Sequence, residues 1–306
     1  MPAFCDMISG WGSNHSEQLN IPSGNNFTAI SAGEQSSLAL REDGTMAAWG
    51  NNHCGLVSNA PARSDVAAIS SGGWHNLGLT TSGSIFSWGW NDYGQTNSPL
   101  GNDFVAVAAG YKHSMALKSN GEISAWGWDG WSLLDVPTDN VFQAIAAGDM
   151  HSVGLTTNGS LVAWGHNGFG QTIAPFGNSF IAVTAGSEHS LALKTDGSLV
   201  AWGNNDLGQC NVPIGNDFVA IAAGYKHSLG LREDGSVLAW GNNSYGETDL
   251  PLYSDAKDLA AGYHHNLALS DSMPVPNPVP TPSATILGIL GLTTAGMKLR
   301  RRQSTR

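Results

Sequence analysis

Residues 104–127 read FVAVAAGYKHSMALKSNGEISAWG, and variants of this stretch recur along the whole chain. An Ala-Gly or Ser-Gly pair marks each copy, with its glycine at Gly33, Gly72, Gly110, Gly148, Gly186, Gly224 and Gly262. A Trp-Gly pair recurs as well, at Trp11, Trp49, Trp88, Trp126, Trp164, Trp202 and Trp240. Both series advance by 38 residues, except for one step of 39 between Gly50 and Ser71. A fixed period of this size is typical of a repeat architecture.

Each copy predicts three β-strands. Within residues 104–127, the segments FVAVAA and SMALKS contain the small, branched and aromatic residues of short extended segments. The pair Asn120-Gly121 then predicts a tight two-residue turn, and EISAWG forms a third strand. Three strands cannot bury both faces of a sheet, so the copies must pack against one another. Radial packing of such units forms a β-propeller.

The number of strands predicts how the ring closes. The last copy, residues 258–271, supplies two strands, and the proline-rich MPVPNPVP after it cannot form a third. Residues 7–12, MISGWG, form a third-strand segment with no partners before it. We therefore predict an all-β fold over residues 1–270: a seven-bladed β-propeller of 38-residue, mostly three-stranded blades, closed by the N-terminal strand.

Charge and cysteine content limit the possible functions. Residues 271–306 carry five basic and one acidic side chain, a net charge of +4, so the −11 of the whole chain leaves −15 on residues 1–270. Because nucleic-acid affinity comes largely from Lys and Arg, we expect no nucleic-acid binding by this part of the chain. Cys5, Cys54 and Cys210 show no zinc-ligand spacing and no disulfide framework, so we expect no structural metal.

The repeats over residues 7–270 resemble those of the regulator of chromosome condensation (RCC1) superfamily. The short period, with loops such as Gly94-Gln95-Thr96 that end in a proline three residues on, is most similar to the bacterial β-lactamase inhibitory protein II. This resemblance implies a seven-bladed propeller with three-stranded blades. In the inhibitors, a loop-bearing face covers the active-site entrance of the enzyme. The chromosome-condensation regulators have longer repeats, act as nucleotide-exchange factors on a small GTPase and bind chromatin.

The order of the strands places the residues after Ala-Gly and after Trp-Gly on the same rim of the propeller. The copies differ most at these positions, which are rich in aromatic residues, and Trp and Tyr are enriched at binding hot spots. We expect this rim to bind a protein or a glycan. The candidate binding residues are Trp74, Trp90, Tyr93, Tyr111, Trp128, Trp131, Phe169, Tyr225, Tyr245 and Tyr263.

Two recurrent side chains are interpreted as structural. The Trp of each Trp-Gly pair is expected to be a wedge between blades, where a large aromatic side chain buries about 150–250 Å². Six histidines recur at one position, at His75, His113, His151, His189, His227 and His265. Side chains on six separate blades cannot meet around one ion, so we expect hydrogen-bonded histidines and no metal site.

No GxSxG, HExxH, Walker-type or EF-hand motif occurs in the sequence, so we expect no catalytic residue and no cofactor. Three other functions stay open: an inhibitor of a secreted hydrolase, an RCC1-type guanine-nucleotide exchange regulator, and an enzyme with a site in the central channel. The last needs titratable groups pointing inward from the first strand of each copy, and those strands are small and apolar. Asx-rich loops such as Asn204-Asn205-Asp206 leave calcium binding open.

The C-terminal residues differ in composition from the repeats. Residues 271–283 are a proline-rich linker, and residues 284–306 are a short apolar segment followed by Lys298, Arg300, Arg301 and Arg302. This arrangement resembles a bacterial PEP-CTERM sorting tail, which implies export, membrane association and processing by an exosortase-type enzyme. A simple tail anchor is the alternative. Since MPAFCDMISG is no secretory signal, we expect the natural start to lie upstream or the sequence to be a fragment.

Overall fold

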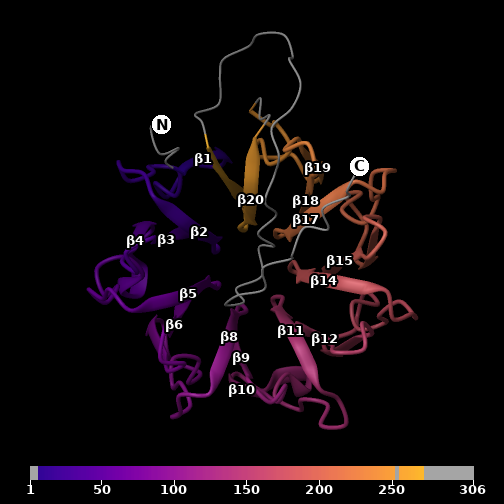
Figure 1. Ribbon diagram of the computed structural model, residues 1–306, viewed down its shortest axis with the longest axis horizontal. Coiled ribbons are helices and arrows are strands. Elements are labelled where there is room, and N and C mark those ends of the chain that lie inside the picture. Colours follow the sequence, from indigo (N-terminus) through magenta and orange to yellow (C-terminus); the bar gives the residue numbers. More distant parts are fainter. Residues whose placement is uncertain (1–5, 252–254, 272–306) are drawn as a thin grey trace, which may run out of the picture.

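The computed structural model describes residues 6–251 and 255–271. Seven three-stranded antiparallel sheets stand around a central axis as the blades of a propeller (Figure 1). The predicted all-β, seven-bladed fold is therefore confirmed. Two single-turn 3-10 helices, η1 (His53–Gly55) and η2 (Gly130–Ser132), lie in loops between blades.

Each blade has an inner, a middle and an outer strand. The inner strands are β2 (Phe27–Ala32), β5 (Val66–Ser71), β8 (Phe104–Ala109), β11 (Phe142–Ala147), β14 (Phe180–Ala185), β17 (Phe218–Ala223) and β20 (Ala256–Ala261). The middle strands are β3 (Ser36–Arg41), β6 (His75–Thr80), β9 (His113–Lys118), β12 (His151–Thr156), β15 (His189–Lys194), β18 (His227–Arg232) and β21 (His265–Ser270). The outer strands are β4 (Met46–Gly50), β7 (Ile85–Gly89), β10 (Ile123–Gly127), β13 (Leu161–Gly165), β16 (Leu199–Gly203), β19 (Val237–Gly241) and β1 (Met7–Gly12).

The last blade contains strands from both ends of the propeller. Strand β1 pairs antiparallel with β21 in a register that runs from Met7 opposite Ser270 to Gly12 opposite His265. The Lys257 ammonium also donates to the carboxylates of Asp6 and Asp271, which flank this strand pair. Closure by the N-terminal strand is thus confirmed, and it removes the open sheet edge that β21 would otherwise expose.

The core lies between neighbouring blades. Trp49 of the first blade packs in one cluster with Leu267 and Leu269 of the last blade. Its Nε1 donates to the Gln18 carbonyl at 2.9 Å, and the other six Trp-Gly tryptophans donate in the same way to a carbonyl of the loop that enters their blade. Each ring therefore fills space between blades and fixes a return loop at the same time.

A belt of buried histidines also joins the blades. Nε2 of His75 lies 2.7 Å from Oγ of Ser114 in the next blade, and Ser114 donates its hydroxyl proton to the Gln95 carbonyl. The serine oxygen must then accept a hydrogen bond from the Nε2–H of the histidine. Burial lowers the pKa of His75 to about 3, so the imidazole is neutral and carries its one proton on Nε2. The same contact recurs from His113, His151, His189, His227 and His265, with Asn266 replacing the serine for His227.

The hairpin turns differ from the prediction. Arg41 N–H donates to the Thr45 carbonyl and Gly44 N–H to the Arg41 carbonyl, which makes a three-residue loop. Only the glycine has a positive φ, +77° at Gly44, whereas a two-residue type I′ turn needs positive φ at both central residues. The Asp43 carboxylate accepts the Thr45 N–H at 2.9 Å, so this residue is favoured because it caps the turn.

The predicted linker over residues 271–283 and the tail over 284–306 lie, apart from Asp271, outside the described residues. Within the described residues, no helix is long and apolar enough to cross a membrane.

Candidate functional site

The two kinds of variable loop lie on one rim. Trp128, directly after a Trp-Gly pair, donates its backbone N–H at 2.9 Å to the carbonyl of Lys112, which is two residues after an Ala-Gly pair. Trp90 donates to Trp74, and His166 to Met150, in the same way. These bonds extend the pairing of the middle and outer strands by one residue, so each blade presents both loops at the same end. We call this end the aromatic rim, defined by the ten candidate binding residues.

Exposure divides the ten residues into two groups. Tyr93, Trp131, Phe169 and Tyr245 are exposed, and Trp131 has the highest exposed fraction, 59%. Trp74, Trp90, Tyr111, Trp128, Tyr225 and Tyr263 are half-buried. The half-buried rings contact other rings of the rim, so they support the exposed ones and still present one edge or face to solvent.

One aromatic cluster surrounds Lys112. Its Nζ lies 5.0 Å from the ring centroid of Tyr93 and 5.6 Å from those of Tyr111 and Trp128. Trp90 packs edge-on against Tyr93 at 5.1 Å. The ammonium group is attracted to the faces of these rings, which stabilises their arrangement.

Tyr111 extends this cluster into the neighbouring blade. Its hydroxyl oxygen accepts a hydrogen bond from Nε1 of Trp74 at 3.3 Å, and Trp74 packs edge-on against His53 at 5.5 Å. Aromatic side chains of two adjacent blades therefore form one continuous surface.

A second cluster lies across the junction of the last two blades. Tyr225 and Tyr263 stack with centroids 3.7 Å apart, and His264 packs against both of them and against Tyr245. Nδ1 of His264 lies 3.0 Å from Oε1 of the buried Glu247. Glu247 holds the position of Gln95, Gln171 and Gln209 in other copies and keeps their bond to a backbone N–H two residues earlier.

The remaining rim residues stand apart from these clusters. Trp131 packs against His166 at 4.8 Å, and Phe169 is exposed on the following loop. Trp131 has φ of +65°, a left-handed conformation that is uncommon for a large side chain. The loop holds this ring outward at a cost in backbone strain.

The Asx-rich loops use their side chains to hold themselves. Asn205 Oδ1 accepts the Cys210 N–H at 2.8 Å, and Asn204 Nδ2 donates to Glu188 and Asp206. Corresponding oxygens of Asn14, Asn91, Asn167 and Asn243 accept a backbone N–H five residues on. Within residues 6–251 and 255–271, no three His, Cys, Asp or Glu side chains lie together as metal ligands.

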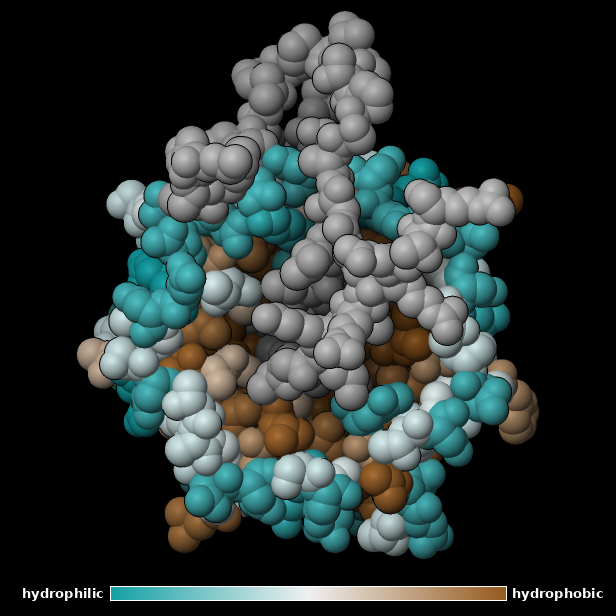
Figure 2. Space-filling model, in the orientation of Figure 1, coloured by the Kyte–Doolittle hydropathy of each residue, from teal (hydrophilic) through white to brown (hydrophobic). Residues whose placement is uncertain are grey.

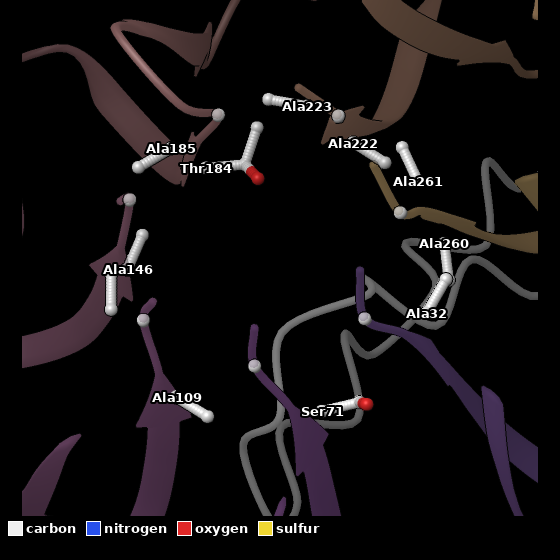
Figure 3. A pocket seen from close by; sticks show the side chains of 18 of the residues that line it. Ala32, Ser71, Ala109, Ala146, Thr184, Ala185, Ala222, Ala223, Ala260 and Ala261 are labelled. Atoms are coloured by element: carbon white, nitrogen blue, oxygen red, sulfur yellow. The ribbon is translucent and has the colours of Figure 1, made fainter. Parts of the chain in front are cut away.

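A cavity of about 190 Å³ follows the central axis. Figure 3 shows its wall of small side chains, among them Ala32, Ser71, Ala109, Ala146 and Thr184, from successive inner strands. Figure 2 shows hydrophobic residues gathered around the centre of the ring and hydrophilic ones around its perimeter. Below its mouth, the wall consists of glycine, alanine, serine, threonine and aliphatic side chains.

The mouth of this cavity is different, and sequence reasoning missed part of it. The residue directly after each Ala-Gly or Ser-Gly pair lines the mouth, and in chain order these are Glu34, Gly73, Tyr111, Asp149, Ser187, Tyr225 and Tyr263. We call these seven residues the mouth ring. Burial and the charge of Asp149 raise the pKa of Glu34 to about 7, and burial raises the pKa of Asp149 to about 6. The inner strands themselves carry mostly small and apolar side chains, and these carboxylates lie two residues beyond the strand ends at Ala32 and Ala147.

Sequence reasoning also missed a row of exposed apolar residues outside the rim. Leu100, Phe176 and Ile214 occupy equivalent positions in three copies, and each is fully exposed. They precede the inner strands, near the hairpin-turn end of the blades. The sequence does mark these three positions, since each residue follows a proline and precedes a Gly-Asn pair in its copy.

Comparisons with known proteins agree with this geometry. Residues 27–56, 66–95, 104–130, 142–171, 180–209 and 218–247 match the family model of the regulator of chromosome condensation (RCC1) repeat, together more than half of the chain. A comparison with curated protein sequences gives no match.

Solved structures share the fold. Prp20p from Saccharomyces cerevisiae is similar with a TM-score of 0.72 at 18% identity, over 87% of this chain and 91% of that one. Human WBSCR16 gives 0.71 at 18% identity, over 87% and 98%. The ectodomain of the receptor kinase CR4 from Physcomitrella patens gives 0.66 at 25% identity, over 77% and 68%. With six repeats matched and seven blades in place, the chain belongs to the family of RCC1-repeat β-propeller proteins.

Proposed function

We propose that this propeller is a non-enzymatic binding module that recognises a partner protein through the aromatic rim. The observation that carries this proposal is the contrast between regular blades and a rim on which ten aromatic side chains gather from loops of different sequence. Tyr, Trp and Phe are enriched at interfaces, and the half-buried rings around Lys112 and His264 pre-organise the exposed ones.

The known relatives support a protein partner over a glycan. The Prp20p structure was described together with its binding to Gsp1p and histones, which shows that a propeller of this fold can recognise proteins. A protein interface also needs a patch of about 800 Å² per partner, and a rim built from loops of several blades is a surface on which such a patch can form. Glycan binding is the alternative outcome, and inhibition of a secreted hydrolase is a narrower form of the same proposal.

We also propose that the protein acts outside the cytoplasm. Support comes from the sequence of residues 271–306, whose proline-rich linker, apolar segment and basic end resemble a sorting tail. The acidic charge of residues 1–270 favours a protein partner over a nucleic acid in that setting.

Site-specific photocrosslinking tests the proposal. A photoreactive amino acid replaces Trp131 on the rim or, as the matched control, Phe176 outside it; both are exposed aromatic side chains. After irradiation in an envelope preparation of the source organism, we expect one protein to be crosslinked from position 131 and not from 176. Equal crosslinking from both positions, or none from 131, would contradict the proposal.

A further inference from the structure

The mouth ring of the central cavity has the composition of a cation site. It contains two carboxylates, three phenol rings, one hydroxyl and one glycine, and no basic side chain. The seven positions are equivalent in the repeat, so the blades supply these groups at one level around one axis. Carboxylates attract a positive charge, and aromatic faces add a cation–π attraction.

The aromatic part of the ring is fixed. Tyr225 and Tyr263 stack at 3.7 Å, with an angle of 19° between the rings. Tyr111 packs against Gly73, where a Cβ would lie 2.6 Å from Cδ2 of the tyrosine ring. Burial raises the pKa values of Tyr111 and Tyr263, so these hydroxyls stay neutral.

The carboxylates of the ring lack a cationic partner. Oε2 of Glu34 is buried and accepts no hydrogen bond, while Oδ2 of Asp149 accepts one from the Ser187 hydroxyl at 2.6 Å. The ion pairs within residues 6–251 and 255–271 involve other residues. The nearby Lys112 and Lys226 lie over tyrosine rings. A buried carboxylate oxygen without a partner is costly, and a bound cation would remove that cost.

The donor set favours an organic cation over a metal ion. The ring holds two carboxylates, and no group of three or more His, Cys, Asp or Glu side chains lies together in the described part of the chain. Calcium takes six to eight oxygen ligands, mainly from carboxylates and carbonyls, and the side chains of the ring supply carboxylate oxygens from two residues only. Ammonium and guanidinium groups need only a few acceptors and gain from aromatic faces.

We propose that the mouth ring binds an organic cation, such as the side-chain ammonium or guanidinium group of a bound protein, between the carboxylates of Glu34 and Asp149 and the rings of Tyr111, Tyr225 and Tyr263. Such a group would enter along the propeller axis and be surrounded by the aromatic rim. The cation site lies on the face used by the proposed function, and it does not require a protein partner to bind a small cation.

The test therefore uses small cations alone and the full chain. The probes are n-butylammonium and ethylguanidinium, which represent lysine and arginine side chains, with uncharged n-butanol as the control. Binding is followed by proton NMR of the probe at pH 8 and constant ionic strength. We expect upfield shifts of the probe protons over the tyrosine rings and no shift of the butanol protons. The cation that binds more tightly shows whether the site prefers a lysine or an arginine side chain.

Matched variants complete the test. The double variant Glu34→Gln/Asp149→Asn should weaken probe binding at least tenfold, whereas Glu233→Gln/Asp196→Asn, which removes the same charge at exposed hairpin turns outside the ring, should leave it unchanged. Thermal unfolding checks that both variants fold, and the first should be at least as stable as the parent protein. Unchanged binding by the first variant, equal binding of butanol, or displacement of the probe by equimolar calcium would overturn the inference. Any of these results would leave the rim crosslinking experiment unaffected.

Discussion

Nε2 of His265 in the last blade lies 2.9 Å from Oγ of Ser37 in the first blade, although 228 residues separate them along the chain. The Ser37 hydroxyl donates to the Gln18 carbonyl, so one serine joins the last blade, the first blade and the loop that enters the first blade. This contact repeats a motif found at five other blade junctions. Here it also closes the ring.

The first prediction concerns Ser37. In the variant Ser37→Ala, the buried Nε2–H of His265 loses its acceptor, and an unsatisfied buried donor costs about 1–3 kcal/mol. We expect a loss of this size in the free energy of unfolding, measured by urea denaturation. Ser36→Ala is the control, because the Ser36 hydroxyl is only 3.4 Å from that of Ser71 and should lose less than about 1 kcal/mol. Equal losses of unfolding free energy in both variants would contradict the prediction that the contact between His265 and Ser37 stabilises the protein more than the Ser36 hydroxyl does.

The second prediction is steep acid unfolding. Burial lowers the pKa values of His75, His113, His151, His189 and His265 to about 3, and it lowers that of His227 as well. In the unfolded chain these groups titrate near 6.5, so below that pH the unfolded state binds protons that the native state excludes. The contribution of the neutral histidines to stability is therefore complete above pH 6.5 and is lost as the pH falls.

The summed effect of the buried histidines on the free energy of unfolding is large enough to unfold the protein in mild acid. At pH 5 each of the five histidines with a pKa of about 3 opposes folding by roughly 2 kcal/mol, and the five together by roughly 10 kcal/mol, comparable to the whole stability of a domain. His227 acts in the same direction. Asp6, Glu34, Asp149 and Asp258 act in the opposite direction, because their pKa values are raised, but they are four groups against six. We expect circular dichroism to show unfolding by about pH 4.5 at 25 °C. A native spectrum at pH 4 would contradict the neutral histidine belt.

The third prediction concerns Asp258 on β20. The six other blades have alanine at this position, namely Ala29, Ala68, Ala106, Ala144, Ala182 and Ala220. Asp258 is fully buried, and burial raises its pKa to about 7. The native state thus resists ionising this group, and stability falls as the pH rises from about 4 through 7.

Asp258→Ala should therefore stabilise the protein at alkaline pH. A difference of about three pKa units corresponds to roughly 4 kcal/mol at pH 8, and the gain should shrink towards pH 5. Urea denaturation at both pH values measures it. A gain that is the same at pH 5 and pH 8 would mean that packing, and not charge, is responsible.

The fourth prediction concerns the glycine of each Ala-Gly pair. A Cβ on Gly148 would collide with the carbonyl oxygen of Gly186, and the same collision recurs from blade to blade until Gly262 meets Gly33. These glycines are required because backbones of neighbouring blades approach closely around the axis. Gly148→Ala should lower the melting temperature by several degrees, since a destabilisation of about 1 kcal/mol shifts it by about 2–4 °C in a domain of this size. Gly215→Ala, next to movable side chains, should change it little.

Much of the fold could be predicted from the sequence, because the same physical requirement recurs in every copy. Each Trp-Gly needs a wedge followed by a positive φ, +103° at Gly127, and each Ala-Gly needs a close backbone approach. Because these requirements recur in every copy, they appear in the sequence as a fixed period. Residues 7–12 form a third-strand segment with no partners before it, which indicates that this segment closes the ring.

The candidate site could be predicted only in part. The strand order predicts that Trp90 and Trp131 lie on one rim, but periodicity cannot show that the charge of Asp149, on the fourth blade, raises the pKa of Glu34, on the first blade. The burial of Asp258 could not be predicted either. An aspartate in place of the alanine of the other copies suggests an exposed position, and only the packing between blades shows that the side chain is buried.

The most direct measurement compares two triple variants for binding to the partner identified by crosslinking. Trp90→Ala/Trp128→Ala/Trp131→Ala removes rings from the rim, and Leu100→Ala/Phe176→Ala/Ile214→Ala removes equally apolar side chains outside it. Calorimetric titration should show affinity at least a hundredfold weaker for the first variant, which corresponds to about 2.7 kcal/mol, and unchanged affinity for the second. If the second variant loses affinity and the first keeps it, the aromatic rim is not the binding surface of this propeller.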